Sequence, residues 1–307
     1  MTILTVFIQM LSLLVMIAAG WIAARTKMLD THTNSNMSQL IVNIFNPLLV
    51  LSSAAGSVGQ VPLSRLLTVF LIAIGMFLFF ILAGSILSPF FDKDPFQRKI
   101  FQLMFVFSNL GFIGIPVVSS VLGAEYVVYV SEFLLIYNLV FYTYGVSLMR
   151  GRFTLGSLRA LINPGNAACI LAMILVLANL PLPGFLRTAV DYLGGAASPL
   201  ALMAVGFTLS NANRKEIFGD KRLYLFVFLK LLALPCLMLP ILRLLPIDAP
   251  LVSVCMVMFG MPVGSMPLML ITQQGLDGKV CTASVLLSTI LCVVTVPILM
   301  ALVSCLP

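Results

Sequence analysis

The chain of 307 residues is strongly apolar: 61% of its residues are hydrophobic and 9% are charged. Soluble domains average about 45–50% apolar and about 25% charged residues, so this composition excludes a soluble globular protein and indicates a membrane protein. The net charge of +7 does not point to nucleic acid as a partner, because the basic residues lie in short joints between apolar runs, as in cytoplasmic loops.

Five apolar segments are predicted in the first half, each near the roughly 20 residues that a membrane-spanning helix needs. The first, residues 3–24, has no basic residue before it and is followed by Arg25 and Lys27, so we interpret it as a retained helix and not a signal peptide. The other four span about residues 38–56, 66–90, 100–122 and 126–149.

The second half repeats this rhythm, with segments at about 163–180, 190–211, 222–245, 250–273 and 280–305. The seventh segment carries Ser198-Pro199 where the second carries Asn46-Pro47. Five segments per half is an odd number, so the halves must insert with opposite orientations, as in inverted-repeat secondary transporters. We therefore predict an all-α membrane protein with one transmembrane domain, 1–307, whose ten helices form a 5+5 inverted repeat of residues 1–150 and 160–307.

The basic residues predict the orientation of the segments, since positively charged loops face the cytoplasm. With the N-terminus outside, thirteen of the 17 lysines and arginines fall in inner loops, three fall in outer loops, and Lys230 lies within a segment. The inner residues are Arg25, Lys27, Lys93, Arg98, Lys99, Arg150, Arg152, Arg159, Arg214, Lys215, Lys221, Arg222 and Lys279. The outer residues are Arg65, Arg187 and Arg243. We expect a multi-pass protein of the cell inner (plasma) membrane with both termini outside.

Two of the segments are interrupted near their centres by residues that disfavour a continuous helix. The fourth contains Asn109-Leu-Gly-Phe-Ile-Gly-Ile-Pro116, and the ninth contains Gly260-Met-Pro-Val-Gly-Ser-Met-Pro267. At 1.5 Å per helical residue, Asn109 lies about 14 Å from one face and Pro262 about 18 Å from the other, both near the middle of a core roughly 30 Å thick. In lipid, broken helices survive only where they line a protein-enclosed cavity. The two breaks are thus predicted to cross at the bilayer centre, where such transporters bind substrate.

The chemistry of these breaks favours an anion. Proline suits the first position of a helix, so Pro116 and either Pro262 or Pro267 would open the second half of each broken helix. Each such end carries about +0.5 charge and free N–H donors, which favour a substrate carboxylate. The side chains of Asn109, Asn46 and Ser265 would add neutral hydrogen bonds. The alternative is that the prolines are only kinks and the polar side chains only satisfy broken backbone.

Two ionisable residues lie inside segments, where a charge is costly and indicates function. Glu132 is placed roughly 9 Å from the outer face and is a candidate proton relay, with a structural role as the alternative. Lys230 is placed roughly 12 Å from the inner face, where its side chain either takes part in coupling or extends to the interface.

Metal, cofactor and enzyme chemistry find little support in the sequence. The six cysteines form no CxxC pair, and the single histidine, His32, lies in a polar loop. A membrane hydrolase would need a cluster of histidine or acidic residues, and a sensor would normally carry a cytoplasmic output domain. We expect no cofactor, no metal and no enzymatic activity.

The whole chain resembles the auxin efflux carrier family in its short prokaryotic form. The resemblance rests on Asn109-x4-Gly114-Ile-Pro116, on Gly260-x-Pro262-x-Gly264-x2-Pro267 and on Leu229-Lys230-Leu-Leu-Ala-Leu-Pro235. Family members export auxin in plants, and bacterial members include carriers for malate and malonate. The resemblance implies a scaffold domain, a moving transport domain that contains the crossing helices, and often a homodimer.

Three glycines of the two breaks, Gly111, Gly114 and Gly264, are further candidate binding residues. The resemblance adds the pair Tyr137 and Asn138, which stand where plant carriers have a glutamine. Three features depart from the plant carriers. The loop between helices five and six is short, the third segment lacks their acidic residue, and that glutamine is absent.

The sequence therefore predicts a secondary carrier for a small organic anion, such as a mono- or dicarboxylate, that works by an elevator mechanism. The alternative is a sodium- or proton-coupled symporter or antiporter of the bile-acid-symporter type, which shares the inverted-repeat plan with cation antiporters. A membrane sensor is a further alternative.

The predicted orientation can be tested by labelling. A cysteine introduced beside Met1 or Pro307, in a background that lacks Cys305, should react with a membrane-impermeant thiol reagent in intact cells. Labelling that occurs only after lysis would reverse the orientation.

Overall fold

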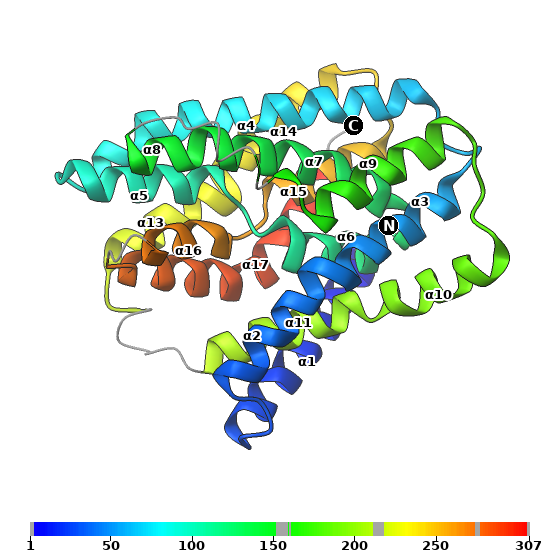
Figure 1. Cartoon of the computed structure of the whole chain (residues 1–307). Helices are drawn as coiled ribbons and strands as arrows, with labels where there is room; N and C mark the ends of the chain where they lie inside the picture. Colours follow the sequence, from blue (N-terminus) through cyan, green and yellow to red (C-terminus); the bar gives the residue numbers. More distant parts are fainter. Residues whose placement is uncertain (1–2, 152–158, 160, 211–217, 274–276, 306–307) are drawn as a thin grey trace. The chain divides into compact units, whose positions relative to one another are not determined.

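The computed structural model describes residues 3–151, 159, 161–210, 218–273 and 277–305 (Figure 1). Within these ranges the chain is helical, and extended pairing there is confined to one isolated antiparallel bridge between Ser108 and Val263. Seven of the described helices are long and apolar enough to cross a membrane, and three shorter apolar helices accompany them. The all-helical membrane class is thus confirmed. Met1, Arg152, Arg214, Lys215 and Pro307, on which part of the orientation argument depends, lie outside the described residues.

The chain folds into two compact units, and each takes segments from both halves of the sequence. Unit 1 consists of Met1–Leu71, Leu110–Leu135 and Ile162–Asn211, and unit 2 consists of Ile72–Asn109, Ile136–Leu161 and Ala212–Pro307. The units therefore do not coincide with the predicted repeats, 1–150 and 160–307, which stay a prediction.

Unit 1 is held together by close approaches between helix backbones. Its helices are α1 (Ile3–Arg25), α2 (Thr31–Leu40), α3 (Asn46–Ser57), α6 (Ile115–Val121), the start of α7 (Val127–Val140), α9 (Pro164–Leu177), α10 (Gly184–Gly195) and α11 (Ala197–Ser210). Helices α1 and α11 lie side by side (Figure 1), and a Cβ atom on Gly206 would collide with the backbone of Ile17 and Trp21. A Cβ atom on Gly194 of α10 would lie 2.8 Å from the Cα of Leu49 in α3. Glycine at these positions lets the helices pack backbone to backbone, as small residues do in membrane interfaces.

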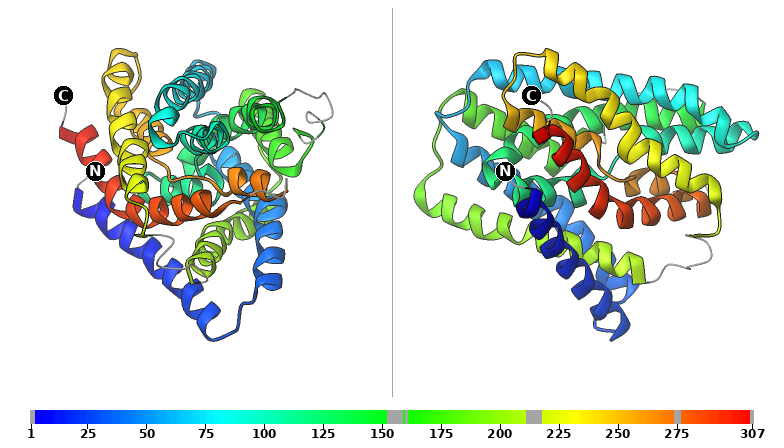
Figure 2. Two further views of the ribbon diagram at one scale, coloured as in Figure 1. Left: turned by 90° about the vertical axis from the view of Figure 1, so that its left-hand side faces the viewer. Right: turned by 180° about the vertical axis from the view of Figure 1, so that it is seen from behind.

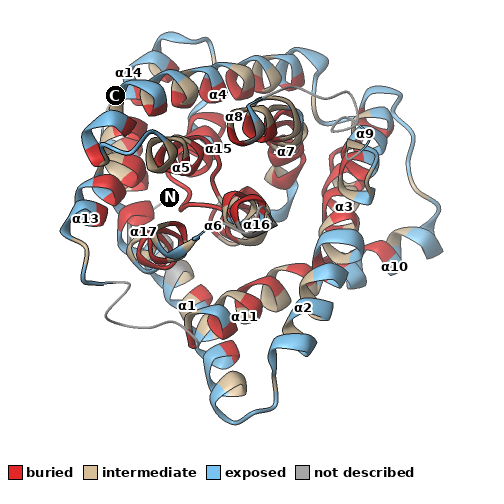
Figure 3. Cartoon of the chain, turned by 60° about the vertical axis from the view of Figure 1, so that its left-hand side comes forward, coloured by how far each residue is buried: buried red, intermediate tan, exposed pale blue. Residues whose placement is uncertain are grey.

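Unit 2 surrounds one thoroughly buried helix. Its helices are most of α4 (Leu63–Phe91), α5 (Pro95–Val106), the end of α7, α8 (Val146–Arg150), α13 (Lys221–Phe228), α14 (Leu234–Leu244), α15 (Ala249–Phe259), α16 (Ser265–Gln273) and α17 (Lys279–Cys305). Every residue of α15 from Leu251 to Phe259 is buried (Figure 3). Beside it, the rings of Phe91, Phe101, Phe105 and Phe226 pack with centroid distances of 4.7–5.9 Å.

Three prolines follow π-helical turns in the same register. The π turns Ile41–Phe45, Leu110–Gly114 and Leu229–Ala233 each end two residues before a proline: Pro47, Pro116 and Pro235. A proline inside an α-helix lacks an N–H and its ring clashes with the carbonyl four residues earlier. The wider π turn relieves that clash, so the helix continues through the proline. In Figure 2, the yellow segment from Lys221 to Leu244 is one continuous rod that contains such a turn.

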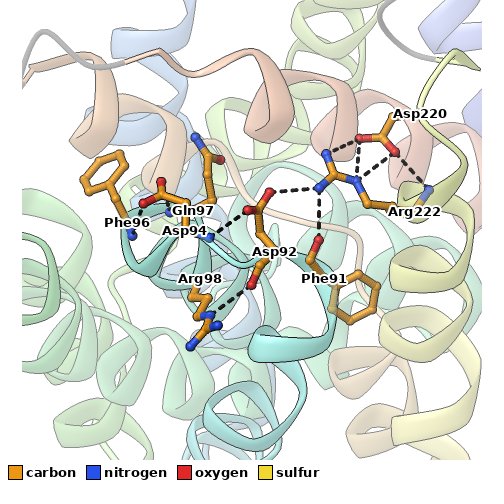
Figure 4. A network of polar contacts seen from close by, with 8 residues as sticks. All are labelled: Phe91, Asp92, Asp94, Phe96, Gln97, Arg98, Asp220 and Arg222. Carbon is orange, nitrogen blue, oxygen red and sulfur yellow. Dashed lines mark hydrogen bonds and ion pairs between the residues drawn. The ribbon is translucent and has the colours of Figure 1, made fainter.

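A polar network at one end of unit 2 joins the α4–α5 loop to the start of α13 (Figure 4). The guanidinium group of Arg222 donates to Asp92 at 2.8 Å, to Asp220 at 2.9 Å and to the carbonyl of Phe91 at 3.0 Å. The pKa of the Asp92 carboxyl lies below its usual value, first because the backbone N–H of Asp94 donates to it and also because of Arg222. The hydrogen bond from Arg222 likewise lowers the pKa of Asp220. Asp94 and Asp220 also cap the N-termini of α5 and α13, so both helices begin at fixed points.

Candidate functional site

The fourth and ninth predicted segments are broken, and their breaks pair with each other inside unit 2. Helix α5 ends at Val106, helix α15 ends at Phe259, and the backbone is extended at Phe107. The backbone N–H of Asn109 donates to the carbonyl of Pro262 at 2.7 Å, and the N–H of Gly264 donates to the carbonyl of Phe107 at 2.9 Å. These bonds form a short antiparallel bridge, which we call the crossover: residues 107–109 with residues 260–264.

The crossover satisfies backbone groups that the helix breaks leave without partners. Besides the two bonds of the bridge, the N–H of Val263 donates to the hydroxyl of Ser288 in α17 at 3.1 Å. Glycine is required at position 264 by the close approach of the two segments of the crossover, because a Cβ atom there would lie 2.9 Å from the carbonyl oxygen of Ser108. Buried backbone groups are costly unless paired, so these contacts fix the geometry of the break.

Of the three prolines considered, Pro116 and Pro267 stand at the starts of helices, as predicted, and Pro262 does not. Pro116 stands in the first turn of α6, as expected, but the helical course already resumes at Leu110 through a π turn. Pro262 does not open a helix; it lies in the extended break, and α16 begins at Ser265. Pro267 lies in the first turn of α16, where its missing N–H costs nothing.

Unit 2 also contains the predicted site residues Tyr137, Asn138 and Ser265. The ring of Tyr137 packs edge-on against the ring of Phe107, with centroids 5.5 Å apart, so Tyr137 lies beside the crossover. Ser265 is exposed at the first position of α16, and Asn138 is half-buried on α7.

The predicted site residues Asn46, Gly111, Gly114 and Pro116 belong to unit 1. The amide nitrogen of Asn46 lies 3.7 Å from the position of a Cβ atom on Gly111, so the second segment and the resumed fourth helix approach each other closely. The amide oxygen of Asn46 is buried and has no hydrogen-bond partner among the described residues. Gly114 and Pro116 are buried.

Glu132, in the unit 1 part of α7, is completely buried. Neither of its carboxyl oxygens has a hydrogen-bond partner among the described residues. Cys169 of α9 is close enough to interact with it electrostatically. A carboxyl group without partners is costly in an apolar interior. Hydrogen bonding among the described residues therefore gives no structural reason for Glu132.

Lys230, in unit 2, is also completely buried, so of the two alternatives for this residue, the one in which its side chain extends to the interface is wrong. Its Nζ donates to the carbonyl oxygen of Phe105 at 2.5 Å and lies 3.9 Å from the centroid of the Phe80 ring. The helix buries this side chain because Lys230 falls on its inward stripe, together with Leu223, Phe226, Leu231 and Leu234.

Sequence reasoning missed a set of buried hydroxyl groups in unit 2. The hydroxyls of Ser108 in the crossover and of Ser284 and Thr295 on α17 are buried without a partner among the described residues. Ser284 and Ser288 stand four residues apart and so share a face of α17. That spacing in the last segment was the available signal. Among the described residues, no group of three or more His, Cys, Asp or Glu side chains is placed to hold a metal ion.

Comparison with known proteins adds two findings. A family model described as "membrane transport protein" matches residues 5–156 and 153–300. The chain is also 26% identical over 306 residues to an uncharacterized transporter of Methanothermobacter thermautotrophicus, and the match covers 94% of this chain and 95% of that protein.

The close approach at Gly264 gives a direct test of the crossover. Gly264→Ala should destabilise the protein by about 1–3 kcal/mol, because the added methyl group overlaps the Ser108 carbonyl. As the matched control, Gly75→Ala in α4 adds a methyl group that meets nothing within 4 Å and improves helix propensity. Thermal unfolding of the detergent-purified variants measures both. Equal unfolding midpoints for the Gly264→Ala and Gly75→Ala variants would show that the two segments of the crossover do not approach each other at Gly264.

Proposed function

The chain belongs to the membrane transport protein family, the family of the auxin efflux carriers that its sequence resembles, and we propose that it is a secondary active transporter for a small organic anion. The substrate class is a mono- or dicarboxylate. The observation that carries this proposal is the crossover. In many secondary transporters, two discontinuous helices that meet near the middle of the membrane form the substrate site.

The electrostatics of unit 2 support an anion. Helix α16 begins directly after the crossover, and its first N–H groups carry the positive end of the helix dipole. Among the described residues of unit 2, the ionisable side chain that is completely buried is that of Lys230, which also carries a positive charge when protonated. The buried hydroxyls of Ser108 and Ser284 add neutral donors.

The way the crossover is built supports an elevator-type mechanism. The paired residues of the two breaks, 107–109 and 260–264, belong to unit 2 and are joined by hydrogen bonds within it, so a movement of unit 2 would keep this pairing intact. Unit 1 would then act as the scaffold. Alternating access of this kind is largely a rigid-body movement of one bundle against another.

The remaining features of the proposal concern the membrane. Seven long helices and three shorter apolar ones support a ten-segment inverted repeat. The distribution of basic residues supports a location in the cell inner membrane with both termini outside. A homodimer is the proposed assembly, by similarity to the family.

A coupled mechanism, with a proton as the driving ion, is the second candidate. It is favoured by Glu132, whose carboxyl group is buried without a partner among the described residues. Intramembrane carboxyl groups of this kind form proton relays in transporters. Sodium coupling, as in bile-acid symporters, is the other form of this alternative.

The binding role of Asn109 can be separated from its role in the crossover. Asn109→Ala removes the amide but keeps the backbone N–H that donates to Pro262. A hydrogen bond to a charged ligand is worth about 1.5–3 kcal/mol, so affinity should fall roughly ten- to a hundredfold. A thermal-shift screen of dicarboxylates and aromatic carboxylates identifies a ligand, and calorimetry then measures its affinity.

Asn43→Ala, which changes an exposed asparagine of unit 1, is the control and should bind as the wild type does. If no carboxylate stabilises the wild type or accumulates in proteoliposomes, the anion proposal fails. If a carboxylate binds both variants equally, the anion proposal stands but the ligand does not contact Asn109.

Glu132→Gln tests proton coupling. The amide cannot exchange a proton, so uptake driven by a pH gradient should fall at least tenfold while carboxylate affinity stays within about twofold of the wild type. Uptake is measured in proteoliposomes with and without an imposed gradient. A variant that still responds to the gradient as the wild type does would remove Glu132 from coupling.

A further inference from the structure

Lys230 occupies a position that its helix otherwise reserves for apolar side chains. Along α13, the following π turn and α14, the buried residues recur at helical spacing, and Lys230 is the charged one among them. Its four-carbon chain does not bring the ammonium group to water, because the whole residue is inaccessible. Burying an ammonium group costs several kcal/mol unless nearby groups compensate.

The groups around the ammonium are those that bind a dehydrated monovalent cation. Phe105, whose carbonyl accepts from Nζ, is the second-last residue of α5. The last carbonyls of a helix have no partner within it and carry its partial negative charge. The face of the Phe80 ring, 3.9 Å away, also attracts a cation.

The π turn that carries Lys230 also lies beside the second break. The carbonyl oxygen of Leu231 is 3.8 Å from the position of a Cβ atom on Gly260, the first residue after α15. The Lys230 side chain contacts the helix that leads into the first break. This one turn of helix therefore touches the approaches to both breaks.

Other carbonyls of the crossover are already engaged. The carbonyl of Phe107 accepts from Gly264, and the carbonyl of Pro262 accepts from Asn109. A sodium ion at this place would need several oxygen ligands. The carbonyls of Phe105, Phe107 and Pro262 each accept one donor from the protein and keep a second lone pair, and of these three donors the Lys230 ammonium is the positive one.

We propose that the Lys230 ammonium is the fixed cation of the crossover and holds the place that a coupled sodium ion would otherwise take, so that anion transport does not require sodium. This inference rests on the proposed transport of an organic anion. It argues against the sodium-coupled form of the second candidate and leaves proton coupling or transport without a coupled ion.

The wild-type protein provides the first test, which needs no substrate. Purified wild-type protein should show no saturable binding of ²²Na⁺ in a scintillation proximity assay. Its unfolding midpoint should be the same in sodium chloride and in choline chloride of equal ionic strength, since an ion that binds only the folded state would raise it. Saturable binding of ²²Na⁺ by the wild type would overturn the proposal.

Variants at position 230 provide the second test. Lys230→Ala removes the ammonium and frees the Phe105 carbonyl, so this variant should bind ²²Na⁺ saturably, which the wild type should not. Sodium should also raise its unfolding midpoint by roughly 2 °C or more. Lys230→Arg keeps a cation in place and should resemble the wild type. The control is Lys279→Ala, which changes an exposed lysine at the start of α17 and should not alter sodium binding.

A Lys230→Ala protein that folds but responds to sodium no more than the wild type would also overturn the assignment. If that variant does not fold, the wild-type assay still decides. Replacing sodium by choline in the proteoliposome assay should change wild-type uptake of the identified carboxylate by less than about twofold. Uptake that needs sodium refutes the fixed cation alone, whereas the absence of any carboxylate uptake refutes the proposed function.

Discussion

A backbone N–H or C=O group without a partner costs several kcal/mol in a membrane, and the crossover has to meet that constraint twice. Each helix break leaves free carbonyls on one side and free N–H groups on the other. The two breaks solve the problem jointly, since Asn109 donates to Pro262 and Gly264 donates to Phe107. Ser288 and Lys230 supply the other partners from α17 and the π turn. Neither break would be stable without the other, which explains why α5, α15, α16 and α17 belong to one compact unit.

The sequence predicted the helices well because their signal is strong and local. Long apolar runs bounded by charges gave bounds within a few residues for helices such as α1, α4 and α17. The location of the breaks was also predictable, because Asn, Gly and Pro all disfavour a continuous helix when they stand together in the centre of an apolar run. The residue at which each helix resumes was not. Pro116 follows a π turn, whereas Pro262 lies in extended backbone, and a pattern of prolines alone does not distinguish these conformations.

The candidate site was harder to predict than the fold, because burial depends on which face of a helix meets another. Lys230 illustrates this. Its depth along the segment suited a side chain that reaches the interface, yet its phase on the helix places it among Leu223, Phe226 and Leu234. The serines of α17 are a similar case. Single serines in an apolar helix carry little information, and Ser288 gains a role only when Val263 is brought beside it by the folded chain.

The two buried charges differ in what the surrounding protein does for them. Lys230 has a carbonyl oxygen and an aromatic face within contact distance, and both are groups that attract a cation. The oxygens of Glu132 have no hydrogen-bond partner among the described residues, so nothing there compensates a permanent charge. A cation with compensating partners can stay charged throughout the transport cycle and so keep the electrostatic potential at the crossover positive. The charge of a carboxyl group without such partners can vary instead, because its protonation can follow the access of water as the protein changes conformation. In the proposed function, Lys230 of unit 2 would thus contribute to the binding of the anion and Glu132 of unit 1 to the coupling of a proton.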